Sequence, residues 1–233
     1  MEKTNFLAGI SDKTIQDYIL HLRKRPKQGT ENEFLGERSI AGYINNLRVI
    51  LYYFMKKGYV TPFSIEIPKA DKKVRETYTA SEIEQLLVKP DIKKCRFSEY
   101  RNWVIINYIL ATSNRISTVT NLRIRDLNFE DEEITLITVK NKKPYILPMD
   151  RRLKKILIEY LSYRKGELDD YVFCPESDSR RPLTKRGIQT AIATYNTSRG
   201  TSKTSAHIIR NYFAKHYLLN RRATIELDED FRA

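Results

Sequence analysis

The sequence has few cysteines and no long apolar runs, which are typical of secreted, zinc-binding or membrane proteins. Its 233 residues include two cysteines, eight glycines, eight prolines and one tryptophan. Cys95 and Cys174 are far apart and form no C-x-x-C pair, so the sequence suggests neither a disulfide framework nor a zinc site. No apolar run approaches the length of a membrane span, and the first residues lack the apolar core of a signal peptide. We therefore expect a cytoplasmic protein with buried, reduced thiols.

Acidic residues are also in short supply. The chain has 29 Asp and Glu against 42 Lys and Arg, which gives a net charge of +13 and an isoelectric point near 9.6. An excess of this size is typical of proteins that bind nucleic acids, although a basic surface without such a partner is also compatible with it. Apolar residues make up 41% of the chain, enough for folded cores in one large or two small domains.

Two helices are predicted near the N-terminus. Apolar residues recur at helical spacing from Thr14 to Arg23, and a stretch containing Pro26 ends this pattern. A second helix is expected to begin with Ser39 as its cap and to end near Gly58. Its apolar stripe consists of Ile40, Ile44, Leu47, Leu51 and Phe54.

A basic stretch, IEIPKADKKVR at residues 65–75, separates this part from the rest of the chain. It contains Pro68 and has no helical stripe, so we interpret it as an exposed linker, with an ordinary solvated loop as the alternative. We expect a helical domain at residues 1–66, the linker at residues 67–76 and a second domain at residues 77–233.

The second domain is predicted to combine helices with one β-hairpin. In the hairpin, β-forming runs from Ile134 to Val139 and from Pro144 to Pro148 flank a polar turn from Asn141 to Lys143. Helices are expected after a cap at Thr79 or Ser81, from Trp103 to Leu110, from Leu153 to Leu161, after a cap at Thr184, and in SAHIIRNYFAKHYLLN near the end. The fold class is therefore mainly α with a small β-hairpin.

Four side chains are placed where they could act on a phosphodiester: Arg115, Lys140, His207 and Arg210. Arg115 follows the buried helix and Lys140 ends the first hairpin strand. His207 and Arg210 are three residues apart on one helix face. Guanidinium groups match phosphate oxygens, and a lysine or a histidine can move a proton. Taken singly, each also has an ordinary explanation, as a capping or ion-pairing arginine, a turn lysine or a solvated helix face.

Two long stretches contain a recognisable order of motifs. The run ATSNRISTVTNLRIRDLNFEDEEITLITVKNKKPYILPM resembles the first signature box and the following β-hairpin of the tyrosine recombinases, the phage and transposon integrase family. SAHIIRNYFAKHYLLN is similar to the H-x-L-R-H helix of that family. RPLTKRGIQTAI and the N-terminal segment from TIQDYILHLRKR to LRVILYYFMKKGYV are similar to family features too. The resemblance covers nearly the whole chain.

The resemblance implies a helical SAM-like core-binding domain and a mixed α+β catalytic domain that clamp double-stranded DNA. Arg115, Lys140, His207 and Arg210 would be the family's first arginine, hairpin lysine, histidine and second arginine, which activate the scissile phosphate while a tyrosine attacks it. The phosphotyrosine linkage conserves the bond energy, so the resemblance implies no metal, nucleotide or other cofactor and no small-molecule substrate. A homo-oligomer on the DNA is compatible with it.

The sequence departs from the family pattern at several positions. Thr118 stands where glutamate is usual, Asn141 where glycine is usual, and Asn211 where a histidine commonly follows the second arginine. After Arg210 the sequence contains only two tyrosines, Tyr212 and Tyr217, and we expect both to pack in the core. We therefore expect the attacking tyrosine to be absent and the chain to be incomplete or inactive in DNA cleavage.

Two alternatives remain open. A non-enzymatic protein on the same fold could bind duplex DNA at recombination sites or regulate a full-length partner. A small basic RNA-binding protein would share the charge but would prefer RNA to duplex DNA. A covalent adduct with DNA would argue against the first alternative, and a competition between the two nucleic acids would test the second.

Overall fold

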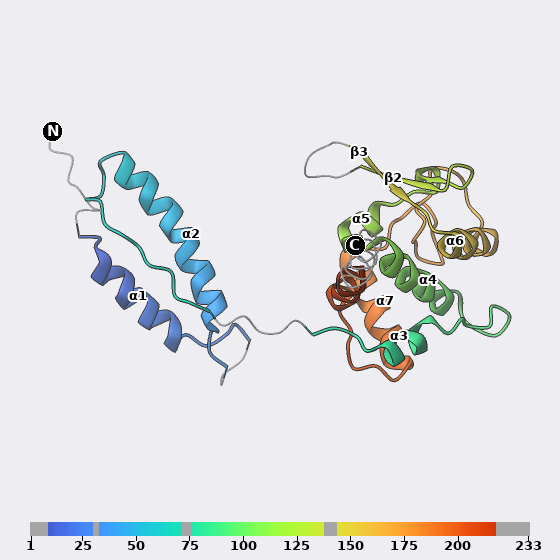
Figure 1. Ribbon diagram of the computed structural model, residues 1–233, viewed down its shortest axis with the longest axis horizontal. Helices are drawn as coiled ribbons and strands as arrows, with labels where there is room; N and C mark the ends of the chain where they lie inside the picture. The colour runs from blue at the N-terminus through green and yellow to red at the C-terminus, as the bar shows by residue number, and fades with distance from the viewer. Residues whose placement is uncertain (1–8, 30–32, 71–75, 138–143, 218–233) are drawn as a thin grey trace, which may run out of the picture. The chain divides into compact units, whose positions relative to one another are not determined.

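The computed structural model describes residues 9–29, 33–70, 76–137 and 144–217. The chain divides into two compact units, Met1–Val74 and Arg75–Ala233, and each is described by itself. The described residues form mostly helices and one small antiparallel sheet, which confirms the predicted fold class (Figure 1). No helix in these ranges combines the length and the apolar character that a membrane crossing needs.

The first unit consists of two antiparallel helices, α1 (Asp12–Lys24) and α2 (Glu37–Lys56) (Figure 1). Its buried side chains come from both helices and from the segment that follows them: Ile15, Ile19, Leu22, Ile40, Ile44, Leu51 and Ile65. The prediction that Ser39 caps α2 is wrong. The amide of Ser39 already donates to the carbonyl of Gly36 at 2.8 Å, and Gly36 occupies the cap position.

Part of the stretch that we expected to be a linker belongs to this first unit. Ile65 is buried and Ile67 packs against the same apolar cluster. The amide of Ile65 also donates to the hydroxyl of Tyr52 on α2 at 3.3 Å. The apolar residues of IEIP are therefore held on the helices, while residues 71–75 lie outside the described residues.

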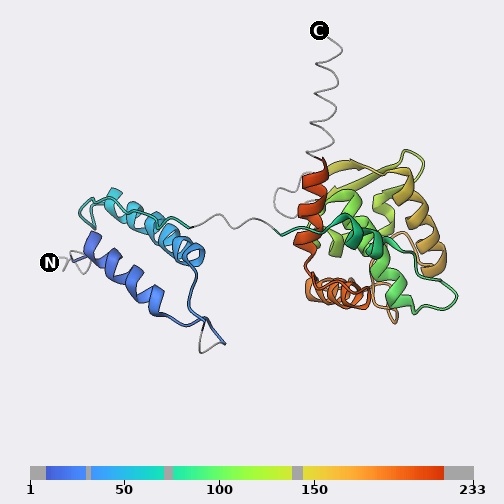
Figure 2. The same cartoon turned by 60° about the horizontal axis from the view of Figure 1, so that its bottom comes forward.

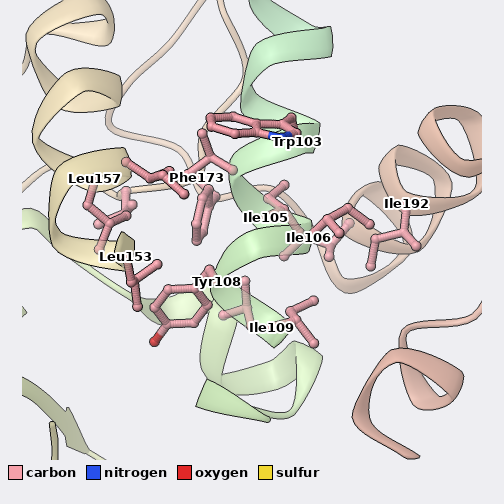
Figure 3. Packing of buried hydrophobic residues seen from close by; sticks show 14 of the residues in the cluster. Trp103, Ile105, Ile106, Tyr108, Ile109, Leu153, Leu157, Phe173 and Ile192 are labelled. Carbon is pink, nitrogen blue, oxygen red and sulfur yellow. The ribbon is translucent and has the colours of Figure 1, made fainter. Parts of the chain in front are cut away.

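The second unit is built around α4 (Phe97–Thr112), whose side chains are buried on all sides. Figure 3 shows its residues Trp103, Ile106 and Tyr108 between Leu157 of one neighbouring helix and Ile192 of another. These neighbours are α6 (Arg151–Arg164) and α7 (Lys185–Ser198), and α3 (Ala80–Leu87) also contacts α4. The buried helix that we predicted is confirmed, with a turn or more added at its N-terminus.

Side-chain caps fix the start of three of these helices, and at α6 the cap is Asp150, whose carboxylate accepts from the amide of Leu153 at 2.8 Å. The amide of Glu82 donates to the hydroxyl of Thr79 at 3.2 Å, so Thr79, and not Ser81, caps α3. The amide of Gly187 donates to the hydroxyl of Thr184 at 2.9 Å, which confirms the predicted cap of α7.

The sheet has three antiparallel strands in the order β1 (Leu127–Asn128), β2 (Glu133–Ile137) and β3 (Pro144–Pro148). Strands β2 and β3 pair from Glu133 opposite Pro148 to Ile137 opposite Pro144, which confirms the hairpin. The two-residue β1 and the 3₁₀ turn before it, Ile124–Asp126, were not predicted. The hairpin turn, including Lys140, lies outside the described residues.

The described chain ends in a helix over residues 206–217. Figure 2 shows this helix and α7 running in clearly different directions, joined by residues 199–205. Ile209 of the helix is buried in the core of the second unit, and Ile208 and Tyr212 pack against that core.

The two cysteines lie in the second unit. Cys174 is buried, whereas Cys95 is only partly buried, and both thiols are free.

Candidate active site

Arg115 stands directly after a sharp reversal of the chain between α4 and α5 (Ile116–Asn121). Ser113 has a φ of 52°, in the left-handed region, and its amide closes α4 by donating to the carbonyl of Ile109 at 2.8 Å. Asn114 is buried and Arg115 is exposed at the N-cap of α5. The reversal thus fixes the backbone of Arg115 and leaves its guanidinium free to meet a ligand.

The buried amide of Asn114 ties this reversal to the β-hairpin. Its Nδ2 donates to the hydroxyl of Tyr108 on α4 at 2.9 Å, and its Oδ1 accepts from the hydroxyl of Tyr145 on β3 at 3.1 Å. Burial raises the pKa of Tyr108 far above its ordinary value, so this hydroxyl stays protonated. Tyr145 is not among the predicted site residues, because no motif or spacing in the sequence connects it to residue 114.

Arg210 reaches the same reversal from the helix of residues 206–217. Its Nε donates to the carbonyl of Ser113 at 2.8 Å. Burial lowers the pKa of Arg210, the neighbouring Arg115 cation lowers it further, and Tyr145 raises it. A guanidinium keeps its charge at any physiological pH. Two permanent cations therefore lie close enough to repel each other, an arrangement that an anion between them would relieve.

His207 lies one helical turn before Arg210 and is exposed. Its amide donates to the hydroxyl of Ser205 at 3.2 Å, at the start of the helix. The structure therefore brings Arg115 and Arg210 together and places His207 on the helix that carries Arg210. Lys140 lies outside the described residues, so the four-residue site stays a prediction.

A dense set of hydrogen bonds holds the segment that leads into this helix. The carbonyl of Lys203 accepts from the hydroxyl of Tyr78 and from Nδ2 of Asn196, each at 2.7 Å. The ammonium of Lys203 pairs with Glu82 of α3 at 2.6 Å. This bond and the capping of Thr79 lower the pKa of Glu82. Residues far apart in the sequence thus set the position of His207 and Arg210.

An open cavity of about 390 Å³ adjoins the site. Its walls come from the start of α5, from α7 and from the start of the last helix, and they include Ile116, Arg186, Gln189, Thr190, Ser205 and Ala206. Arg186, Gln189 and Thr190 follow helical spacing and so share one face of α7. The cavity therefore presents a cation and polar groups beside Arg115 and His207.

Of the three positions that depart from the family pattern, Thr118 and Asn211 make hydrogen bonds in the structure, and Asn141 lies outside the described residues. The amide of Thr118 donates to the carbonyl of Arg115 at 2.8 Å within α5. Nδ2 of Asn211 donates to the carbonyl of Glu76 at 3.4 Å. The expected core packing is confirmed for Tyr212, whose ring also lies 4.0 Å from the ring of His216. For Tyr217 it is wrong, because this side chain is 55% exposed and stacks on Phe213.

In the part of the chain that the structure describes, no group of three or more His, Cys, Asp and Glu side chains is arranged to hold a metal ion. The groups gathered at the site are cationic and hydrogen-bond donors, which suit an anionic ligand.

Two tyrosine recombinases align with most of this sequence. The chain is 28% identical over 192 residues to the tyrosine recombinase XerD of Staphylococcus haemolyticus, an alignment that covers 78% of this chain and 63% of that protein. It is 26% identical over 231 residues to the tyrosine recombinase XerC of Bacillus pumilus, covering 94% of this chain and 72% of the relative. The chain thus spans less than two thirds of the length of the staphylococcal protein.

Solved structures share the fold. The XerH site-specific recombinase bound to a palindromic difH substrate superposes with a TM-score of 0.69 at 18% identity, over 91% of this chain and 60% of that one. The Tn1549 transposon integrase in complex with circular intermediate DNA superposes with a TM-score of 0.65 at 17% identity, over 92% and 74% of the two chains. The model of the phage integrase family matches residues 76–226. Since this match covers more than half of the sequence and agrees with the motifs at Arg115 and Arg210, the chain belongs to the phage integrase family of tyrosine recombinases.

Proposed function

We propose that this chain binds duplex DNA and acts in site-specific recombination, with Arg115 and Arg210 holding one backbone phosphodiester between them. The observation that supports this function best is the contact of Arg210 with the carbonyl of Ser113, which brings the second arginine beside the first. The XerD and XerC proteins described above are named tyrosine recombinases. The DNA-bound XerH recombinase and Tn1549 integrase have the same fold as this chain.

In this proposal each group has a defined task. The two guanidinium groups bind the non-bridging oxygens and stabilise the negative charge that grows on these oxygens when the phosphorus is attacked. His207 donates a hydrogen bond to the same phosphate or moves a proton, and Lys140 protonates the departing 5′ oxygen. A tyrosine hydroxyl gives its proton to His207 or to solvent, forms the new phosphodiester bond and releases that oxygen, so one bond forms as another breaks and no external energy source is needed.

A second candidate function is duplex binding without cleavage. The positions of the described tyrosines favour it, since Tyr212 packs against the core and the hydroxyl of Tyr145 donates to Asn114. Tyr217 follows Arg210 by seven residues, about 10 Å along the helix axis. None of these three hydroxyls is placed for attack on a phosphate held by Arg210.

A covalent trapping experiment separates the two candidates. Duplexes that bind the chain are first selected from a randomised library, and nicked versions are then made so that cleavage releases a short strand and prevents rejoining. Recombinase chemistry predicts a protein–DNA adduct that survives denaturing detergent and disappears in Arg115→Ala and Arg210→Ala. Arg152→Ala, at an exposed position of α6, is the control.

Each outcome is decisive. Tight binding without any adduct would reject cleavage by this chain and support the binding-only function. An adduct that persists when both Arg115 and Arg210 are replaced would refute the assignment of the site. A clear preference for RNA over duplex DNA in a competition would reject both candidates.

A further inference from the structure

A larger cavity, of about 520 Å³, lies between the end of α3 and the start of α6. Its lining residues come from α3, α4 and α6 and from the segment after α3: Leu87, Lys89, Trp103, Arg151, Arg152, Lys155, Ile156 and Glu159. It shares none of them with the cavity beside Arg115, and α6 and α7 pack on different sides of α4 (Figure 3). A phosphate held by Arg115 and Arg210 therefore does not explain this cavity.

The floor of the cavity is apolar and fixed. Trp103 is 3% exposed, and its indole Nε1 donates to the carbonyl of Leu87 at 3.2 Å, which occupies the only polar atom of the ring. Ile156 is almost fully buried beside it, and the exposed Val88 extends the apolar surface outward from Leu87. A hollow of several hundred Å³ with such a floor can take up one large apolar side chain.

The rim of the cavity is cationic. Arg151, Arg152 and Lys155 are exposed and lie at the start of α6. Among the described residues, none of these three side chains has an ion-pair or hydrogen-bond partner. On α3, the exposed Glu84 lies one turn before Leu87 but does not line the cavity. The rim cations repel one another, and an anion between them would relieve this repulsion.

The acidic groups at the cavity are already engaged. Glu159, the one acid among the lining residues, pairs with the ammonium of Lys89 at 2.6 Å. Asp150 accepts from an amide in the first turn of α6 at 2.8 Å, and Glu132 pairs with Lys154 at 3.0 Å. Four cations against one acid leave the lining with a net charge of +3, so the cavity suits an anionic ligand.

The combination of an apolar floor with a cationic rim favours an acidic peptide over DNA. The outside of a duplex consists of phosphates and sugars, so a duplex could meet the rim but would leave the floor unfilled. A peptide can place a Leu, Phe or Trp side chain on the floor and carboxylates on the rim. The acidic turn of a second copy does not fit, because Phe129 beside Glu130 and Asp131 packs against its own core.

We infer that this cavity is the docking site for an acidic segment of a partner protein, in which Asp or Glu residues flank one large apolar side chain. That side chain lies on Trp103. The flanking carboxylates pair with the guanidinium groups of Arg151 and Arg152 and with the ammonium of Lys155. Arginine binds a carboxylate with two parallel hydrogen bonds, which gives such a contact direction as well as strength. The inference does not depend on the proposed function in recombination.

Selection from a library of random displayed peptides on the immobilised full chain tests the inference. Peptides in which Asp or Glu flank Leu, Phe or Trp should be enriched. In a variant that combines Arg151→Gln, Arg152→Gln and Lys155→Gln, this enrichment should be lost. The dissociation constant of the most enriched peptide, measured by fluorescence anisotropy, should rise at least roughly 30-fold. The variant should melt no lower than the wild type, because glutamine suits a helix and the helix dipole repels cations near its start.

The matched control removes three charges elsewhere. Lys13→Gln, Arg38→Gln and Lys56→Gln together alter exposed residues of α1 and α2. A general attraction of acidic peptides to a chain of charge +13 would weaken equally in both triple variants. A docking site at α6 predicts instead that the control variant keeps the enriched peptides and their affinity.

Four results would overturn the inference. The wild type could enrich no acidic peptides, or only acidic peptides without an apolar residue. The control variant could lose as much affinity as the cavity variant. The affinity for duplex DNA could fall as strongly as that for the peptide in the cavity variant, which would assign the cavity to nucleic acid. Peptide affinity could also rise when Glu226, Asp228, Glu229 and Asp230 are changed to their amides, which would make this chain's own acidic segment the occupant.

Discussion

At the scale of single residues, the candidate site contains two arginines near the same reversal of the chain, and the charge of Arg115 lowers the pKa of Arg210. Arg210 is fixed by its bond to the carbonyl of Ser113, and Arg115 by its place at the cap of α5. Neither guanidinium has an acidic partner among the ion pairs of the described residues. The anion that balances them is therefore expected to come from the ligand.

Replacing these arginines with lysine tests whether shape matters as well as charge. A lysine keeps the positive charge but loses the planar fork that binds two phosphate oxygens at once. We expect Arg115→Lys and Arg210→Lys to bind duplex DNA nearly as well as the wild type. If the chain cleaves DNA, adduct formation with the nicked duplex should fall by a factor of about 100 to 1,000, the usual effect of losing one aimed donor. Equal rates of adduct formation for both lysine variants and the wild type would contradict the binding of two phosphate oxygens by each guanidinium group.

Asn114 is the residue whose loss should most disturb the local structure. Asn114→Ala removes the bonds to Tyr108 and Tyr145 and leaves the buried Tyr108 hydroxyl without this partner. We expect the free energy of unfolding in urea to fall by about 1 to 3 kcal/mol. Asn121→Ala is the control, because Asn121 is exposed and bonds only within its own helix. Equal effects of the two changes would argue against the Asn114 network.

At the scale of helices and loops, the segment before His207 depends on the ion pair of Lys203 with Glu82. The pKa of Glu82 is lowered in the folded protein from its ordinary value of 4.5, chiefly by its bond to Lys203. Its ionised form therefore stabilises the folded protein above that value, and the stabilisation is lost as the pH falls through the lower folded value.

Glu82→Gln should consequently melt at a lower temperature than the wild type near pH 7, and the gap should close on acidification below about pH 4. Glu84→Gln, an exposed position on the same helix, serves as the control and should show no such gap. Melting curves followed by circular dichroism between pH 3 and pH 7 measure both. A gap for Glu82→Gln that widens in acid would show that the sign of the linkage is wrong.

Arg186 of α7 is the described cation of the cavity beside the site, and it tests whether the DNA backbone passes there. If Arg186 binds one phosphate, Arg186→Ala should reduce the slope of log affinity against log salt by about 0.9. Arg152→Ala alters α6, which lines a different cavity with Trp103, and should leave the slope unchanged. If Arg186→Ala leaves the slope of log affinity against log salt unchanged, the DNA backbone does not pass beside Arg186.

The elements that could be predicted from the sequence are those whose signals are local. The caps Thr79 and Thr184, the buried character of α4 and the pairing of β2 with β3 follow from neighbouring residues. The prediction for Ser39 was wrong because Gly36, a glycine with an extended backbone, takes the cap position three residues earlier. Tyr217 was misjudged because helical spacing alone does not reveal where the core ends.

The candidate site could be predicted only in part. Arg115, His207 and Arg210 could be predicted from the order of the motifs. That Arg115 and Arg210 lie near the same reversal of the chain is seen only in the structure. The contributions of Tyr145 and Tyr78 could not be predicted, since their partners Asn114 and Lys203 lie 31 and 125 residues away. Contacts at such separations depend on how helices pack, which local patterns do not encode.

At the scale of the whole molecule, the net charge of +13 should make the proposed binding to DNA depend on salt. Each phosphate that the protein neutralises releases counterions, so log affinity should fall by about 0.9 per phosphate for every tenfold rise in salt. We expect a slope that corresponds to several phosphates when binding is measured by fluorescence anisotropy at a series of salt concentrations. A flat response would argue against a phosphate-binding surface in this chain.

The contact between Ser113 and Arg210 spans 97 residues of sequence. A ribosome therefore makes the reversal after α4 long before it makes the arginine that completes the pair, and closing so long a loop must wait for the helices between them to fold. A newly made chain can attract nucleic acid by charge at an early stage. If Arg115 and Arg210 hold a backbone phosphate as proposed, they can do so only after the helix of residues 206–217 has docked, so the order of synthesis itself would delay the appearance of the site.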